Sequence, residues 1–266
     1  MRWVTLAAAS LLFAATSGIA RAADIPVKPA RSAVLAVPTP WSGFYVGGNI
    51  GYGWINDDSG ALDTFSPSFR NAVTNNSVTL NHRLRPEGVV GGGQIGYNWS
   101  ATPNWIVGVE ADFQGSDLRG FSTVNQPGTP GVATPALNTA SQKLSWFGTV
   151  RGRVGYAGLP STNTLLYVTG GLAFGRVETS AGLTAVPSTS GIFFGADRET
   201  RTGFAVGAGA EHAFSEKWRA KLEYLYMDLR STSVRSLDPV QFPGSFLDYG
   251  FDNRYHILRA GVNYAL

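Results

Sequence analysis

Residues 146–156 have the two-residue period of a β-strand. Because successive side chains of a strand point to opposite faces, one face carries an aromatic and aliphatic stripe and the other carries Arg151 and Arg153. A soluble sandwich would turn the apolar face inward. An outer-membrane barrel would turn that face to lipid and leave the arginines in the lumen. One strand is compatible with both architectures, so the choice depends on how the pattern repeats.

The alternation recurs in eight stretches, each close to the 9–11 or so residues that a tilted membrane strand needs. These stretches are 43–54, 88–99, 105–114, 146–156, 165–177, 202–214, 218–229 and 254–266. The connections between them alternate in length. The long ones, rich in Ser, Thr, Asn, Pro and Gly, are 55–87, 115–142, 178–201 and 230–253, and the short ones are 100–103, 159–164 and 215–217.

An even number of strands with short turns at one end and long loops at the other is typical of outer-membrane barrels. A sandwich gives no reason for that segregation of loop lengths. We therefore predict an all-β fold, an eight-stranded antiparallel up-and-down transmembrane β-barrel with four long extracellular loops. Both termini are expected on the periplasmic side.

The N-terminus has the features of a secretory signal. Arg2 precedes an apolar run, and Ala20-Arg21-Ala22 is a small-x-small cleavage sequence, so cleavage is expected between Ala22 and Ala23. Residues 23–41 contain four prolines and no alternation, which predicts an extended periplasmic segment before a barrel domain over residues 42–266.

The composition narrows the class of protein further. Cleavage removes Arg2 and Arg21 but no acidic residue, which lowers the net charge of +3 by two and leaves no argument for a nucleic-acid partner. The chain has no cysteine, so burial and strand pairing must stabilise an exported fold. A total of 33 glycines with only 15% charged residues favours strands over helices.

Aromatic residues gather at the ends of the predicted strands, where the rings of an aromatic girdle meet the membrane–water interface. The predicted girdle is Trp41, Trp54, Trp99, Trp105, Trp146, Trp218 and Tyr264. Outer-membrane lipid and lipopolysaccharide are therefore expected partners of the outer face.

The predicted lumen carries four acids and five bases: Glu110, Asp112, Arg151, Arg153, Glu211, Arg219, Lys221, Glu223 and Arg259. Eight strands enclose little more than side chains, and a charge confined there needs a partner. We predict a paired charge network that plugs the lumen. A narrow ion path lined by the same charges is the alternative.

Other sequence features predict no catalytic, cofactor or metal site. Gly91-x-Gly93-x-x-Gly96 matches a dinucleotide-binding pattern, but strand residues follow it where that site needs a helix. His82, His212 and His256 are scattered and interpreted as polar loop or rim residues. An enzyme that hydrolyses or transfers lipid A acyl chains with a Ser–His pair aided by an acid is a competing class, but no short Ser/His motif is found near the outer rim.

The loops could bind an unknown ligand, because recognition residues are often carried by loops on a rigid scaffold. The first long loop has His82, Arg83 and Arg85, and the third has Phe193, Phe194, Asp197, Arg198 and Arg201. These side chains could contact lipopolysaccharide phosphates or a haem propionate, whereas the simpler interpretation is solvated loop charge.

A set of segments resembles a known family. The segments are Trp41–Gly53, Gly108–Asp112, Trp146–Ala157, Leu166–Ala173 and Lys221–Tyr226, with the start Ala23–Lys28. Together they resemble the alphaproteobacterial outer-membrane immunogenic proteins, the Omp25/Omp31-like porin family, over nearly all of the mature chain outside the long loops. The resemblance implies an eight-stranded outer-membrane barrel with a structural, surface-antigen role. The absence of a Ser–His motif separately predicts that the protein is not an enzyme.

The C-terminus departs from the usual barrel pattern. Outer-membrane barrels usually end in an aromatic residue that the barrel-assembly machinery reads, whereas this chain ends in Tyr264-Ala265-Leu266. We still expect that machinery as a partner, with a weakened signal.

Overall fold

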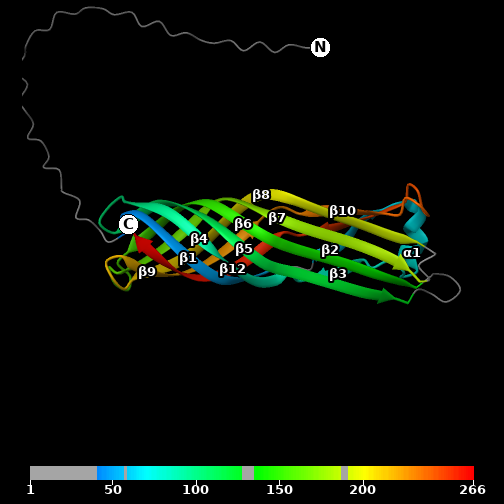
Figure 1. The fold of residues 1–266 in the computed structure, drawn as a ribbon, viewed down its shortest axis with the longest axis horizontal. Coiled ribbons are helices and arrows are strands. Elements are labelled where there is room, and N and C mark those ends of the chain that lie inside the picture. Colours follow the sequence, from blue (N-terminus) through cyan, green and yellow to red (C-terminus); the bar gives the residue numbers. More distant parts are fainter. Residues whose placement is uncertain (1–40, 57–58, 128–134, 187–190) are drawn as a thin grey trace, which may run out of the picture. The chain divides into compact units, whose positions relative to one another are not determined.

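The computed structural model describes residues 41–56, 59–127, 135–186 and 191–266 (Figure 1). The predicted signal peptide, its cleavage site between Ala22 and Ala23, and nearly all of the predicted periplasmic segment lie outside these residues. Within the described ranges, neither of the short helices has the length and apolar character to cross a membrane.

Eight antiparallel strands form a closed ring, which confirms the predicted fold class. In chain order they are β1 (Gly43–Trp54), β4 (Glu87–Ser100), β5 (Trp105–Gln126), β6 (Ala136–Ala157), β7 (Thr164–Ala185), β8 (Ile192–Ala213), β9 (Trp218–Asp228) and β12 (Arg254–Ala265). Each pairs with its neighbour in this order, and β1 pairs with β12 to close the ring. The connections β4–β5, β6–β7 and β8–β9 are short and share one end of the ring, the turn end, with the C-terminus (Figure 1).

The long connections contain strands of their own. These are β2 (Ser59–Phe65), β3 (Asn81–Leu84), β10 (Thr232–Leu237) and β11 (Phe246–Phe251), with the short helices η1 (Pro67–Phe69) and α1 (Arg70–Thr74). They extend the sheet from β8 in the order β8-β10-β11-β2-β3. We call these strands, with residues 118–126, 136–144, 177–185 and 192–199 of β5–β8, the distal tier.

The prediction of loops over most of residues 115–142 and 178–201 is therefore wrong. Strands β5–β8 are each 22 residues long and continue past the predicted ends. Apolar alternation stops there because inward positions of β6 carry amides. Asn138 accepts a hydrogen bond from the Thr79 backbone N–H at 3.1 Å, and Gln142 accepts one from the Ser59 hydroxyl at 2.8 Å. The backbone pairing is unaffected by this change of side chain.

The ring and the distal tier have different interiors. Inside the distal tier, buried Leu84, Phe193, Leu247, Tyr249 and Phe251 belong to one apolar cluster. A second apolar cluster, which we call the junction layer, includes Leu118, Leu144, Val177 and Phe147 and fills the level where the two tiers meet. The lumen of the ring on the other side of that layer is filled mainly by charged side chains.

Candidate functional site

The centre of the ring lumen holds a network of ion pairs built on Arg151 of β6. Its guanidinium group donates to the Glu110 carboxylate at 2.6 Å and to the Asp112 carboxylate at 2.9 Å, and lies 3.3 Å from the Glu223 carboxylate. Strand register explains the first contact, because Glu110 pairs directly with Arg151 across β5 and β6. All these side chains are at most 2% exposed.

Three further bases extend the network across the lumen. Lys221 of β9 donates to both oxygens of Glu110 at 2.8 and 2.9 Å. Arg259 of β12 lies 2.6 Å from Glu223 and 3.0 Å from Asp112. Arg153 donates to Glu211 of β8 at 2.6 Å. The network thus connects β5, β6, β8, β9 and β12, strands from both halves of the chain.

Arg219, the ninth predicted lumen residue, lies at the turn end. It is 2% exposed, and its guanidinium carbon lies 5.0 Å from the centroid of the Trp41 ring. All nine predicted charges are thus buried inside the ring. A cation over an indole face is a favourable contact in a desolvated site.

Three neutral side chains of the network were missed by the sequence analysis. Tyr45 donates to Glu110, Tyr167 donates to Glu223 and Thr149 donates to Asp112, each at 2.8 Å. The sequence pattern could have identified them, because the residues on either side of each one are apolar or glycine and face outward, whereas each of the three lies on the inward face of its strand. Gly96 makes room for Tyr45, since a Cβ there would lie 2.3 Å from the phenol ring. This places one glycine of the dinucleotide-like pattern inside β4, in a steric role.

Apolar side chains close the lumen on both sides of the charges. Along β6, inward Phe147 belongs to the junction layer, Arg151 and Arg153 follow in the network, and Ala157 belongs to a cluster at the turn end. Trp41 lies in that last cluster, where its indole N–H donates to the Thr162 carbonyl at 3.1 Å. The lumen is therefore filled in layers: apolar, charged, apolar.

The prediction that Trp41 belongs to the aromatic girdle is wrong, because Trp41 is 1% exposed and lies inside the mouth of the ring. It precedes the first residue of β1, so strand alternation does not determine its direction. Trp99, Trp105 and Trp218 are half exposed at the turn end, and Tyr264 packs edge-on against Trp218. Trp54 and Trp146 lie toward the distal tier, where Trp54 stacks on His256 and Trp146 on Phe113. Their placement at a membrane interface stays a prediction.

The interpretation of His82 as a polar loop residue is wrong. It lies on β3 inside the distal tier, is 3% exposed, and neither ring nitrogen has a hydrogen-bond partner among the described residues. Burial lowers its pKa from 6.5 to about 4. His212 is near the turn end, next to the Thr164 hydroxyl, and His256 lies on the outward face of β12 between Trp54 and Tyr224.

The two predicted groups of loop-ligand residues are only partly accessible. Phe193 is 3% exposed and points into the distal tier, whereas Phe194 is 61% exposed on the opposite face of β8. Arg198 pairs with Glu178 at 3.2 Å, and Arg201 contacts Asp197 and Glu199. Arg83 and Arg85 lie at and after the end of β3 and also have partners. The structure does not join these groups into one site.

Comparison with known proteins gives consistent matches along the chain. The family described as outer membrane protein beta-barrel domain matches residues 7–265. The 31 kDa outer-membrane immunogenic protein of Brucella melitensis is 35% identical over 266 residues, which are 99% of each chain. The 22 kDa outer membrane protein of Rhizobium leguminosarum is 31% identical over 247 residues, 91% of this chain and 83% of that protein.

Solved structures show weaker similarity. OprG, an outer membrane protein of Pseudomonas aeruginosa, aligns with 85% of this chain and 97% of its own at 11% identity and a TM-score of 0.45. Neisserial surface protein A aligns with 85% of this chain and 98% of its own at 13% identity and a TM-score of 0.40. The strand pairing described above, rather than these alignments, establishes the ring.

Proposed function

Because this chain belongs to the outer-membrane β-barrel family, with the outer-membrane immunogenic proteins as relatives, we propose that it is a structural barrel of the bacterial outer membrane whose lumen does not conduct ions. The observation that carries this proposal is the Arg151 network, whose ion pairs span the lumen at distances of 2.6–3.3 Å. Acids and bases that neutralise each other at such distances leave little free charge for a passing ion.

The apolar layers support a closed lumen independently of the charges. A channel that conducts must keep a hydrated path, and apolar constrictions lose their water. Here the junction layer on one side of the network and the Trp41 cluster on the other are both buried. An ion would have to disrupt three layers in turn.

The test is conductance of the refolded mature protein in a planar bilayer, with folding checked on the same sample by heat-modifiable gel mobility. We expect no discrete current steps from folded protein. Reproducible steps would overturn the closed lumen and make the network a selectivity filter.

A double variant tests the network itself. Arg151→Ala with Arg153→Ala is expected to lower the temperature at which the gel mobility changes, because buried acids lose their partners. The matched control is Lys143→Ala with Arg198→Ala, two bases on the outer faces of β6 and β8. Equal heat stability and unchanged conductance in both double variants would contradict the network's role.

We also propose that the distal tier lies outside the cell and is the antigenic surface; the relative from Brucella melitensis is named an outer-membrane immunogenic protein. Barrels of this class place short turns in the periplasm and long connections outside. Lipopolysaccharide is the partner proposed for the edge of the distal tier that adjoins the ring. At that edge Arg119, Lys143, Glu178 and Arg198 form one outward row across β5–β8, in which three bases outnumber one acid.

Surface labelling of whole cells tests the orientation. A cysteine at Val240, which is 87% exposed in the β10–β11 connection, should react with a membrane-impermeant maleimide. A cysteine at Glu216, in the β8–β9 turn, should react only after the outer membrane is opened. The reverse labelling pattern would show that the barrel has the opposite orientation in the membrane. Insertion by the barrel-assembly machinery remains part of the proposal.

A further inference from the structure

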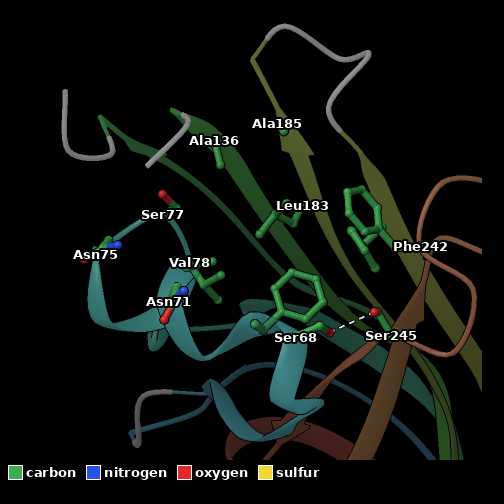
Figure 2. Close-up of a pocket in the computed structure, with 13 residues that line it drawn as sticks. Ser68, Asn71, Asn75, Ser77, Val78, Ala136, Leu183, Ala185, Phe242 and Ser245 are labelled. Atoms are coloured by element: carbon green, nitrogen blue, oxygen red, sulfur yellow. Dashed lines mark hydrogen bonds between the residues drawn. The ribbon is translucent and has the colours of Figure 1, made fainter. Parts of the chain in front are cut away.

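The distal tier contains a cavity of about 290 Å³ at the end farthest from the turns. Its lining residues come from five places in the chain: residues 68–78, which include η1, α1 and the segment after α1, then the start of β6, the end of β7, the start of β8, and the β10–β11 connection. Figure 2 shows Val78, Leu183 and Phe242 around the space, with Ala136 and Ala185 at its far side. The volume is near the lower limit of the roughly 300–1,000 Å³ that small-molecule sites occupy.

One wall of the cavity is aromatic. Phe193 is the central ring: Phe69 packs edge-on against it with centroids 4.7 Å apart, and Phe242 lies tilted at 5.7 Å. Phe193 is 3% exposed, whereas Phe242 is 41% exposed at the rim. Aromatic rings prefer edge-to-face or offset contacts with other rings, so this wall favours a flat aromatic guest.

Polar side chains also line the cavity, and none of them is charged. Ser68, Asn71, Asn75 and Ser245 supply hydroxyl and amide groups, and the Ser68 and Ser245 hydroxyls are 2.8 Å apart (Figure 2). Of the 13 lining residues, all within the described part of the chain, none is ionisable. A charged guest would lose water without gaining an ionic partner, whereas a hydroxyl or carbonyl group would find donors and acceptors.

We propose that this distal cavity binds a small uncharged aromatic molecule that carries a hydrogen-bonding substituent. The aromatic wall selects the ring, the serine and asparagine groups select the substituent, and the lack of ionisable lining residues selects against charge. The site is separated from the lumen charges by the buried distal core and the junction layer, so it does not depend on whether the lumen conducts.

The test is calorimetric titration of the mature protein in lipid nanodiscs with 2-naphthol, with empty nanodiscs as the blank. We expect saturable binding, and roughly tenfold weaker binding of 2-naphthoate, which has the same ring system and a negative charge. Decahydro-2-naphthol, which keeps the hydroxyl and loses the aromatic face, is also expected to bind more weakly. No saturable heat above the blank, or equal binding of the naphthoate, would overturn the proposal.

Variants separate the cavity from nonspecific partition. Phe193→Ala removes the central ring and is expected to weaken 2-naphthol binding roughly tenfold. Ala185→Leu fills the cavity while the aromatic wall is kept, and should have the same effect. The matched control is Phe194→Ala, the next residue of β8, whose ring faces away and is 61% exposed. Each variant is first checked for heat-modifiable mobility. This cavity would be excluded as the site if Phe194→Ala lost as much 2-naphthol affinity as Phe193→Ala, or if a folded Ala185→Leu variant bound 2-naphthol with unchanged affinity.

Discussion

The ring and the distal tier are filled in opposite ways, although β5–β8 run through both. On β6, Arg151 points into the ring and Val150 outward, whereas Leu144 points into the distal tier and Lys143 outward. A β-bulge between Leu144 and Trp146 marks the change. The medium outside each region explains the difference: an apolar outer face suits lipid and leaves polar residues for the inside, whereas a polar outer face suits water and leaves apolar ones.

The largest expected effect comes from breaking the ring network at one acid. Glu110 accepts contacts from Lys221, Arg151 and Arg153, and is 2% exposed. Glu110→Gln leaves these bases without their full counter-charge, and we expect a loss of about 3–5 kcal/mol in the free energy of unfolding. Urea unfolding in lipid vesicles, followed by tryptophan fluorescence, measures it. Glu178→Gln, on the outer face of β7, is the control, and equal losses in the two variants would mean that the lumen charges are solvated.

A substitution that removes a buried side chain from the distal tier should lower stability less, and only locally. Leu247 of β11 is fully buried in the distal core, and Leu247→Ala is expected to destabilise that tier by about 3 kcal/mol through lost packing. Protease should then cleave the β10–β11 region faster while heat-modifiable mobility persists. Leu237→Ala, at a residue 46% exposed on β10, is the control. Loss of the folded gel band in Leu247→Ala would show that both tiers unfold as one unit.

Acidification should weaken the distal tier through His82. Burial lowers its folded pKa to about 4 from 6.5, so the neutral form stabilises the tier fully above pH 6.5 and this stability declines as pH falls toward 4. Between these two pKa values the free energy of unfolding falls by about 1.4 kcal/mol for each unit that the pH drops. Protease cleavage of the distal tier should thus be faster at pH 5.5 than at pH 7.

The variant His82→Leu isolates this effect, because leucine can occupy the apolar site beside Tyr249 but cannot titrate. Cleavage rates of this variant should change much less between the two pH values. A pH dependence equal to that of the unmodified protein would assign the effect to other groups.

The smallest change in stability is expected from an exposed ion pair on the outer surface, at the level of the junction layer. Asp117 lies 3.3 Å from Arg119, with side chains 59% and 70% exposed. Solvent screens such pairs, so Asp117→Asn should leave the urea midpoint unchanged within error. A shift as large as that of Glu110→Gln would remove the contrast between buried and exposed charges.

The sequence predicts the ring well because two signals coincide there. Outward positions are apolar and inward ones are polar or glycine, and the register then brings Glu110 opposite Arg151. Tyr45 and Tyr167 were visible on the same inward face, but a tyrosine is compatible with either environment. Their hydrogen bonds to Glu110 and Glu223 depend on the distance across the lumen, which alternation does not give.

The distal tier could not be predicted in this way. Its strands carry serine, threonine and small residues on both faces, and the inward amides Asn138 and Gln142 bind segments from the first and the last long connections. His82 is buried by β11, a strand that follows it by more than a hundred residues. Trp41 was misplaced because it precedes the first strand, where no period assigns a face.

The pairing of β1 with β12 has a consequence for biosynthesis. Ten residue pairs, from Tyr45 with Ala265 to Trp54 with His256, join the two ends of the chain. Until residues 254–266 have been exported, β1 and β9 are open edges with unpaired backbone groups, which lipid cannot satisfy. The chain must therefore be held in the periplasm, shielded from aggregation, until its last segment arrives. A chain cut short before β12 would leave β1 and β9 with unpaired edges rather than close into a smaller barrel.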